Sequence, residues 1–172
     1  MAGSSALSAV DALLVQLVQK NARTTNKELA RTAGIAESTC LDRIRSLEHR
    51  GIIKGWHAEI ALEALGRPIR ALVSVRMQPK TTESLRAFYT AVLEAPETLR
   101  VWMVTGADDF LIEVGVPTVD HLRTFTLERI TTWPDVADTR TALVYDEAGK
   151  DVLENLDPPE DHPPHHASRR EP

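Results

Sequence analysis

Polar side chains are concentrated in a stretch near the start of this 172-residue chain, in a pattern that suits contacts with nucleic acid. Ser38 and Thr39 carry hydroxyls that can bond base edges or phosphates. Arg43 can donate two hydrogen bonds to one guanine, or it can hold a phosphate. Arg45 and Lys54 suit phosphates. The residues that we expect to meet double-stranded DNA are Arg23, Thr25, Ser38, Thr39, Asp42, Arg43, Arg45 and Lys54.

For some of these residues a role other than DNA contact stays open. The carboxylate of Asp42 repels phosphate unless it pairs with a neighbouring arginine or accepts a hydrogen bond from cytosine. Any one of the arginines can instead be a solvated surface charge.

Residues 25–51 are typical of two short helices joined by a tight turn, which would position these side chains. Thr25 and Glu28 have the spacing of a capping box at the start of the first helix. Gly34 suits the left-handed residue that ends that helix, and Gly51 closes the second one. This pattern predicts a helix-turn-helix, whose second helix enters the major groove. The alternative is a pair of packed helices in an all-α domain.

The flanking residues extend this unit on both sides. Val10, Leu13, Leu14, Leu17 and Val18 follow helical spacing, so a further helix begins after a Ser8 cap. After the pair of helices, we expect residues 52–60 to form a β strand that enters a wing.

The second half of the chain has the strand and helix patterns of a β-α-β-β-α-β arrangement. Strands are predicted over 69–77, 99–105, 110–116 and 136–145, with helices over 82–93 and 118–130. Four antiparallel strands would then be backed by two helices on one face. The apolar residues Trp102, Val104 and Leu143 suggest that the other face is covered by a second subunit.

Composition and charge narrow the possible functions. Hydrophobic residues make up 42% of the chain, which is ample for a core, and no apolar run approaches the ~20 residues of a membrane span. Cys40 is the single cysteine, so it cannot form an internal disulfide, and its spacing suits a buried position. These features predict a cytoplasmic protein without a membrane partner.

The net charge of −5 is unevenly distributed. Residues 1–60 hold eight basic and six acidic side chains, whereas residues 146–172 hold three and eight. The expected DNA-facing part is therefore mildly basic, and local charge matters more than the total for phosphate contacts. Residues 148–172 read as a disordered acidic tail. His162, His165 and His166 within it lack a preorganised shell, so we expect no metal site and no cofactor.

Together these motifs resemble the Lrp/AsnC family of transcription regulators over residues 7–147. The stretch ELARTAGIAESTCLDRIRSLEHRGIIKGWHAEI is similar to the family's helix-turn-helix and following strand. VTGADDFLIEVGVP resembles its Gly-x-x-Asp hairpin, and WPDVADTRTALV resembles its last turn and strand. Ala36, Ala107 and Asp135 depart from the family pattern, the first of them at a helix cap that usually holds serine.

The resemblance implies an α+β protein with three parts. These are a winged helix-turn-helix over 1–60, a ferredoxin-like βαββαβ effector domain (RAM, ACT-like) over 61–147, and the acidic tail over 148–172. It also implies a homodimer that reads a two-fold operator and assembles further, often to an octamer. The effector would be an amino acid or a related small molecule bound between subunits.

The effector site carried over by position lies at the Gly-x-x-Asp turn and the last strand. Its residues are Met103, Thr105, Gly106, Ala107, Asp108 and Asp109, with Thr139, Thr141 and Leu143 from a neighbouring chain. Backbone N–H groups of such a turn can hold a carboxylate, and Asp109 can pair with an ammonium group. The alternative is that Asp108 and Asp109 only form a hairpin turn.

The sequence therefore predicts a sequence-specific, nucleoid-associated transcription regulator that responds to a small effector, and it predicts no enzyme activity. Two other functions stay open. One is a metabolite-binding module that regulates proteins rather than DNA. The other is a catalyst similar to the sirohaem decarboxylases, which look like the same two-domain fold, although His121 is the single histidine in the expected sheet domain.

Overall fold

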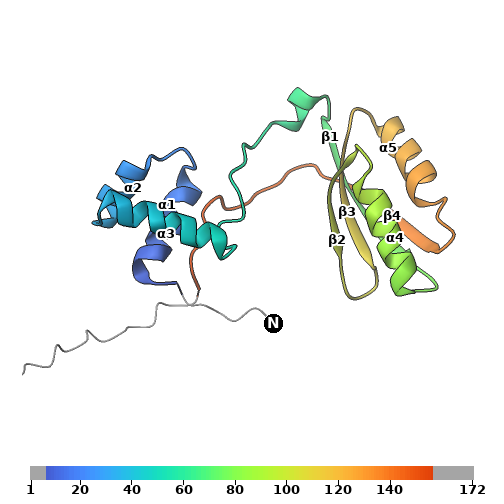
Figure 1. The fold of residues 1–172 in the computed structure, drawn as a ribbon. Coiled ribbons are helices and arrows are strands. Elements are labelled where there is room, and N and C mark those ends of the chain that lie inside the picture. The colour runs from blue at the N-terminus through green and yellow to red at the C-terminus, as the bar shows by residue number, and fades with distance from the viewer. Residues whose placement is uncertain (1–6, 157–172) are drawn as a thin grey trace, which may run out of the picture. The chain divides into compact units, whose positions relative to one another are not determined.

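The computed structural model describes residues 7–156 and divides into two compact units (Figure 1). Residues 7–57 together with 149–156 form the first unit, and residues 58–148 form the second. Most of the predicted acidic tail, including its three histidines, lies outside the described residues.

Three helices build the first unit: α1 (Ala9–Lys20), α2 (Asn26–Ala33) and α3 (Glu37–His49). The predicted capping residues are confirmed. The Ser8 hydroxyl accepts from the backbone N–H of Asp11 at 3.1 Å, and Thr25 and Glu28 complete a capping box. Gly34 ends α2 with a φ of 67°, a left-handed conformation that glycine adopts without steric cost. Local hydrogen bonding therefore sets where α1 and α2 begin and where α2 ends.

The three helices pack around a small apolar core. Leu14, Cys40 and Leu47 are fully buried at its centre, one from α1 and two from α3. Burial raises the pKa of the Cys40 thiol, because the charged thiolate is poorly solvated there. Cys40 is thus a small buried hydrophobe, as its helical spacing predicted.

The β strand predicted over residues 52–60 is wrong. The N–H groups of Ile52 and Ile53 both bond the carbonyl of Leu47, at 2.9 and 3.2 Å, so they complete the end of α3. Within residues 7–156, every strand belongs to the sheet of the second unit. Residues 52–60 therefore have no neighbouring strand, and without one a ladder of hydrogen bonds cannot form.

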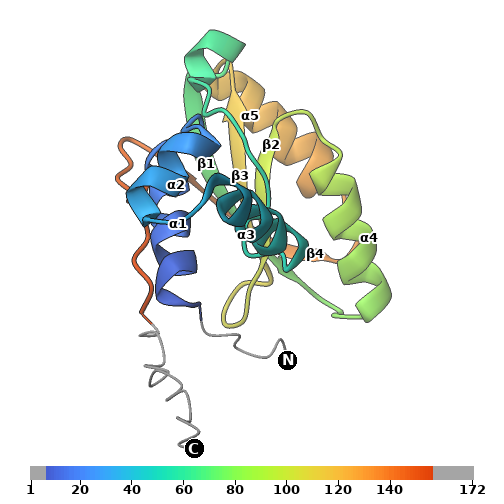
Figure 2. The same cartoon turned by 60° about the vertical axis from the view of Figure 1, so that its left-hand side comes forward.

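The second unit is an antiparallel four-stranded sheet with helices on one face, as Figures 1 and 2 show. Its elements in chain order are η1 (Leu62–Leu65), β1 (Ile69–Met77), α4 (Thr82–Leu93), β2 (Thr98–Met103), β3 (Phe110–Val116), α5 (Val119–Phe125), the π-helical segment η2 (Thr126–Ile130) and β4 (Val136–Leu143). The strand order is β2-β3-β1-β4. This confirms the predicted ferredoxin-like arrangement, with β2 and β4 at the edges.

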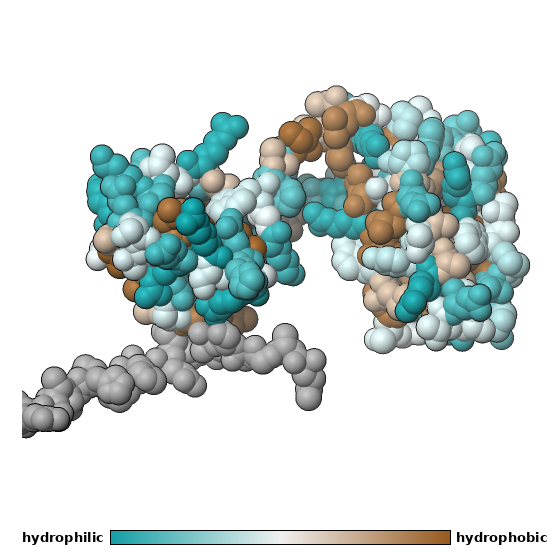
Figure 3. Space-filling view, viewed as in Figure 1, coloured by the Kyte–Doolittle hydropathy of each residue, from teal (hydrophilic) through white to brown (hydrophobic). Residues whose placement is uncertain are grey.

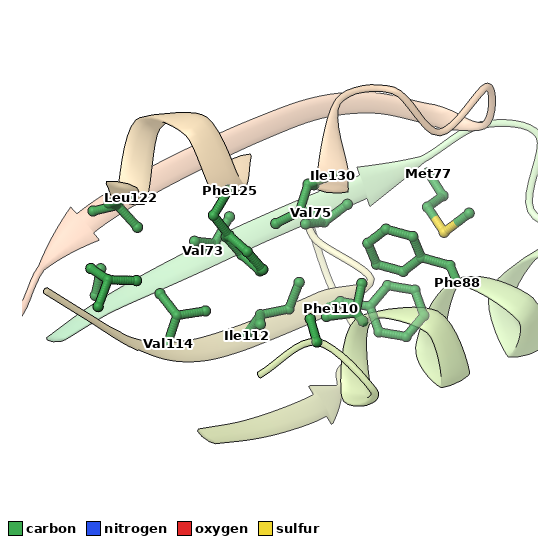
Figure 4. Close-up of a cluster of buried hydrophobic side chains, with 14 residues drawn as sticks. Val73, Val75, Met77, Phe88, Phe110, Ile112, Val114, Leu122, Phe125 and Ile130 are labelled. Atoms are coloured by element: carbon green, nitrogen blue, oxygen red, sulfur yellow. The ribbon is translucent and has the colours of Figure 1, made fainter. Parts of the chain in front are cut away.

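Alternation along the two central strands places the core on the helix-covered face (Figure 4). Val73 and Val75 of β1 lie opposite Ile112 and Phe110 of β3, and all four are fully buried. The ring of Phe88 on α4 packs 5.0 Å from that of Phe110, measured between centroids. The helices are thus held to the sheet by one continuous apolar layer.

The other face of the sheet has no covering helix within the described residues. Trp102 lies on it opposite Leu111 and is 39% exposed, and hydrophobic residues gather on the β2 side of this unit in Figure 3. Glu113 is nevertheless buried there, because Arg70 binds its carboxylate. Leu143 does not belong to this face, since it lies opposite Ala71 on the helix-covered side.

The uncapped start of α3 predicts a stabilising substitution. Ala36 has extended N-cap geometry (φ −66°, ψ 148°) but no side chain that can accept from the first turn. We expect Ala36→Ser to stabilise the first unit by about 0.5–1 kcal/mol, because serine supplies that acceptor. Urea unfolding followed by far-UV circular dichroism measures the difference. Ala22→Ser, at an exposed site that starts no helix, is the control and should change little. Equal stability of Ala36→Ser and the unchanged protein would contradict the expectation.

Candidate DNA-binding surface and effector site

Helix α3 presents a polar face to solvent. Ser38, Asp42 and Arg45 follow helical spacing on the side away from Cys40 and Leu47, and all three are exposed. Thr39 is exposed beside them in the first turn. Hydrophilic residues cover most of this unit in Figure 3. The structure therefore brings four of the predicted DNA-binding residues together on one surface.

Arg43 has a different environment. Its Nη1 donates to the Asp11 carboxylate at 2.9 Å and to the Ser8 hydroxyl at 3.4 Å, so the side chain turns toward α1. Asp11 is only 8% exposed, and Arg50 lies 3.9 Å from its other oxygen. The predicted guanine contact of Arg43 therefore competes with an ion pair that ties α3 to α1.

The remaining predicted positions lie around α3. Arg23 and Lys54 are exposed, and the hydroxyl of Thr25 is engaged in the capping box. Sequence reasoning missed Asn26, whose Nδ2 donates to the Glu37 carbonyl at 2.8 Å and joins the start of α2 to the start of α3. Because Asn26 lies inside the Thr25–Glu28 capping box, the sequence gave no reason to expect its contact with Glu37.

Leu41 was also missed. It is 39% exposed on α3, between the polar residues, and lies off the spacing of the buried side chains. That departure from the helical pattern was the signal in the sequence. An exposed apolar side chain on such a face can contact the methyl group of thymine.

The predicted effector turn joins β2 to β3. Gly106 has a φ of 122°, which only glycine adopts readily, and Thr105 and Ala107 are exposed beside it. Arg140 of β4 donates to both carboxylate oxygens of Asp108, at 2.5 and 2.6 Å. The turn is thereby linked to the edge strand that carries the other predicted effector residues.

Asp109 is engaged within its own chain. One carboxylate oxygen accepts from the buried backbone N–H of Met77 at 2.9 Å, and the other lies 2.8 Å from Lys80 Nζ. Burial by itself raises the pKa of this carboxyl, but hydrogen bonds from Lys80 and Met77 outweigh it, so the pKa lies below its ordinary value. Asp109 thus fastens the hairpin to the end of β1.

Met103 and Thr139, one from each half of the predicted effector site, lie at opposite edges of the sheet. Met103 on β2 is in register with Phe110, which pairs with Val75, which pairs with Thr139 on β4. Three interstrand steps of about 4.8 Å separate Met103 from Thr139, or roughly 14 Å. Thr141 and Leu143 follow along the same edge strand, and both are exposed. Met103 and Thr139 of one chain therefore cannot line the same small pocket, whereas Asp108 reaches β4 through Arg140.

Between residues 7 and 156, no group of three or more His, Cys, Asp or Glu side chains could hold a metal ion. Within that range, no helix is both long enough and apolar enough to cross a membrane.

Comparison with known proteins adds a family match for each unit. Residues 7–54 match a family model described as winged helix-turn-helix DNA-binding, and residues 70–152 match the Lrp/AsnC ligand binding domain. The transcriptional regulator AldR of Mycobacterium tuberculosis is 35% identical over 81% of this chain and 78% of its own length. The leucine-responsive regulatory protein of Rhizobium meliloti is 33% identical, covering 80% of this chain and 88% of its own.

Solved structures agree with the sequence matches. A transcriptional regulator of Neisseria meningitidis, solved as a complex with L-Met, superposes with a TM-score of 0.74 at 25% identity. It covers 91% of this chain and 98% of its own. Residues of both units thus have counterparts in regulators of known structure.

The contacts of Asp109 predict the effect of its replacement. Asp109→Ala leaves the buried Met77 N–H without an acceptor, so we expect it to lower the free energy of unfolding by about 1–3 kcal/mol. Asp109→Asn keeps an acceptor for Met77 and removes only the charge that binds Lys80, so its effect should be smaller. Urea unfolding of both variants at pH 7 measures the two effects.

The lowered pKa also predicts a pH dependence. A carboxyl whose pKa falls on folding stabilises the protein above its ordinary pKa of about 3.9, and this contribution is lost as the pH drops through the lower value of the folded state. The gap between Asp109→Asn and the unchanged protein should therefore close toward pH 3. A gap that stays constant between pH 7 and pH 3 would rule out this ion pair.

Proposed function

Because the chain belongs to the Lrp/AsnC family of DNA-binding transcription regulators, we propose that it reads a specific operator through α3 and responds to an amino acid bound by the sheet unit. The observation that carries the proposal is the exposed polar face of α3. The side chains on this face take no part in the apolar core that holds the helix in place. Membership in a family of regulators argues against the enzymatic alternative.

The residues of α3 divide into two roles. Ser38 and Thr39 contact bases or phosphates near the start of the helix, and Leu41 offers an apolar contact to thymine. Phosphates are held by Arg45 on α3 and by two exposed residues outside it, Arg23 and Lys54. Asp42 lies within the same face and accepts from cytosine or from a neighbouring arginine.

Arg43 acts mainly as a positioning residue. Its ion pair with Asp11 joins α3 to α1, so the angle at which α3 meets DNA depends on it. A side chain already held at 2.9 Å by a buried carboxylate has to exchange that partner before it can bind a guanine.

The sheet unit forms the effector site with a second copy of the chain. Met103 and Thr139 lie at opposite edges of one sheet, so a small pocket that contains both takes one of them from a second chain. Backbone N–H groups near Gly106 suit the carboxylate of an amino acid. Its ammonium group reaches Asp109 by displacing Lys80, whose Nζ lies 2.8 Å from that carboxylate. The structurally similar regulator of Neisseria meningitidis, solved with L-Met, supports this class of effector.

The uncovered face of the sheet supports a homodimer. Trp102 and Leu111 place apolar surface there, and burial against a second copy removes that surface from water. We propose that such dimers assemble further, to octamers, and that the protein acts in the cytoplasm on chromosomal DNA. Light scattering at micromolar concentration tests the assembly, and a monomer at all concentrations would contradict it.

Two arginine variants separate the roles of α3. Arg45→Ala should weaken binding to specific and unrelated duplexes about equally and lower the slope of log affinity against log salt by about 1, because one phosphate contact is lost. Its stability should be unchanged. Fluorescence anisotropy at several salt concentrations measures both quantities. Arg129→Ala, at an exposed site of the sheet unit, is the matched control.

Arg43→Ala should behave differently. It leaves the buried Asp11 without its closest cation, so we expect a loss of about 1–3 kcal/mol in the free energy of unfolding. This is less than for a fully buried pair, because the Arg43 side chain is 38% exposed. If Arg43→Ala is as stable as Arg45→Ala but binds only the specific duplex more weakly, Arg43 reads bases directly.

Thermal-shift screening with individual amino acids tests the effector proposal. A ligand that binds the folded protein raises its Tm by mass action. We expect the shift to shrink in Thr141→Val, which removes an exposed hydroxyl at the edge of β4 without changing the volume of the side chain. Thr90→Val, on the outer side of α4, is the control. If no amino acid raises the Tm of the unchanged protein, an amino-acid effector is excluded at the concentrations used.

A further inference from the structure

A groove in the first unit is lined in part by the chain's own C-terminal segment, residues 151–155. The groove has a volume of about 710 Å³ and runs between α1 and the residues that follow α3. Leu13 and Gln19 line it from α1, and Lys54 and Trp56 line it from the other side. Leu153 and Glu154 complete the lining, and the end of the described chain lies beside α1 in Figures 1 and 2.

The side-chain amide of Gln19 on α1 holds this segment through two hydrogen bonds to the backbone of Leu153. Gln19 Nε2 donates to the Leu153 carbonyl at 3.2 Å, and the Leu153 N–H donates to Gln19 Oε1 at 2.9 Å. The amide thus binds Leu153 as a neighbouring β strand would. The two residues are 134 positions apart, so the contact brings the chain back to its first helix after the sheet is complete.

The contact is shallow. The side chain of Leu153 stays 66% exposed, so little apolar surface is buried with it. At Leu153 the segment is therefore held chiefly by the two hydrogen bonds to Gln19, each of modest net worth in water. A strong competitor for the same surface can displace it.

The charge of the segment identifies that competitor. Asp151 and Glu154 flank Leu153, and Glu154 lines the same groove as Lys54. Lys54 is a proposed phosphate contact, and a nearby carboxylate lowers the positive potential that attracts DNA. The docked segment and the DNA backbone thus oppose one another at this edge of the unit.

We propose that residues 151–155 form an autoinhibitory strap, which docks on Gln19 and lowers the affinity of the first unit for DNA until it is released. The inference rests on the proposed role of Lys54 in binding phosphate. It does not depend on an effector. Because the strap follows β4 along the chain, a movement of the end of that strand can release the strap or let it dock.

Two variants of the full-length chain test the strap. Gln19→Met removes both hydrogen bonds and keeps the length of the side chain. We expect it to tighten binding to a fixed operator-like duplex by about fivefold, which is what two hydrogen bonds at the weak end of their net worth in water contribute. Gln16→Met is the matched control one turn earlier, because Gln16 lines the groove but makes no hydrogen bond to the segment that the structure records. It should leave the affinity unchanged.

Amide exchange reports on docking in the same samples. The Leu153 N–H is bonded to Gln19, so its exchange should be faster in Gln19→Met than in the unchanged protein. An unchanged exchange rate would show that the segment is not held by Gln19 in solution. Faster exchange with equal or weaker DNA affinity would show that the segment docks without inhibiting. Either result overturns the proposal.

A charge variant tests the mechanism. As a single substitution, Glu154→Gln should tighten DNA binding, and this gain should shrink as the salt concentration rises. The same substitution should give no gain when Lys54→Met is already present. An equal gain in both backgrounds would show that the strap does not act through Lys54. If no variant binds any duplex at low salt, the operator-reading function itself fails. Equal binding by Gln19→Met and the unchanged protein overturns the strap alone.

Discussion

The sheet unit depends on one constraint, which is that its helices cover a single face. Alternation along β1 and β3 directs Val73, Val75 and Ile112 into the layer beneath α4 and α5. The side chains between them necessarily point to the opposite face, where no helix of residues 7–156 covers them. The core that stabilises each chain thus leaves a second surface, on which Trp102 remains 39% exposed.

The same constraint shapes the candidate effector site. A four-stranded sheet in the order β2-β3-β1-β4 has two edges, and the predicted effector residues are divided between them. The Asp108–Arg140 ion pair reaches across this end of the sheet, and the contacts of Asp109 hold the hairpin against β1. The turn is thereby kept in position before any ligand arrives, which lowers the cost of ordering it on binding.

The DNA-binding unit is small and relies on a few polar contacts to fix its helices. Asp11 joins α1 to α3 through Arg43, and Asn26 joins α2 to α3. Because the apolar core around Leu14 and Leu47 is non-directional, these hydrogen bonds define the angle at which α3 is presented. The two hydrogen bonds between Gln19 and Leu153 also hold the segment 151–155 against α1.

Local features were readable from the sequence because neighbouring residues alone produce them. The capping box at Thr25, the left-handed Gly34 and the alternation of β1 depend on residues within a few positions of one another. The order of strands and helices in the sheet unit followed from the same periodicities. Residues 52–60 mark the limit of such reasoning, because a strand also needs a neighbour that the local pattern does not supply.

Contacts between distant residues were decided by the tertiary structure alone. Arg43 pairs with Asp11, Asp109 with Lys80 and Met77, and Gln19 with Leu153. A charge pattern shows that a side chain can bind DNA or a ligand, but it does not show which groups of its own chain already hold it. That outcome depends on how helices and strands pack, since a shift of a few ångströms separates a hydrogen bond from no contact.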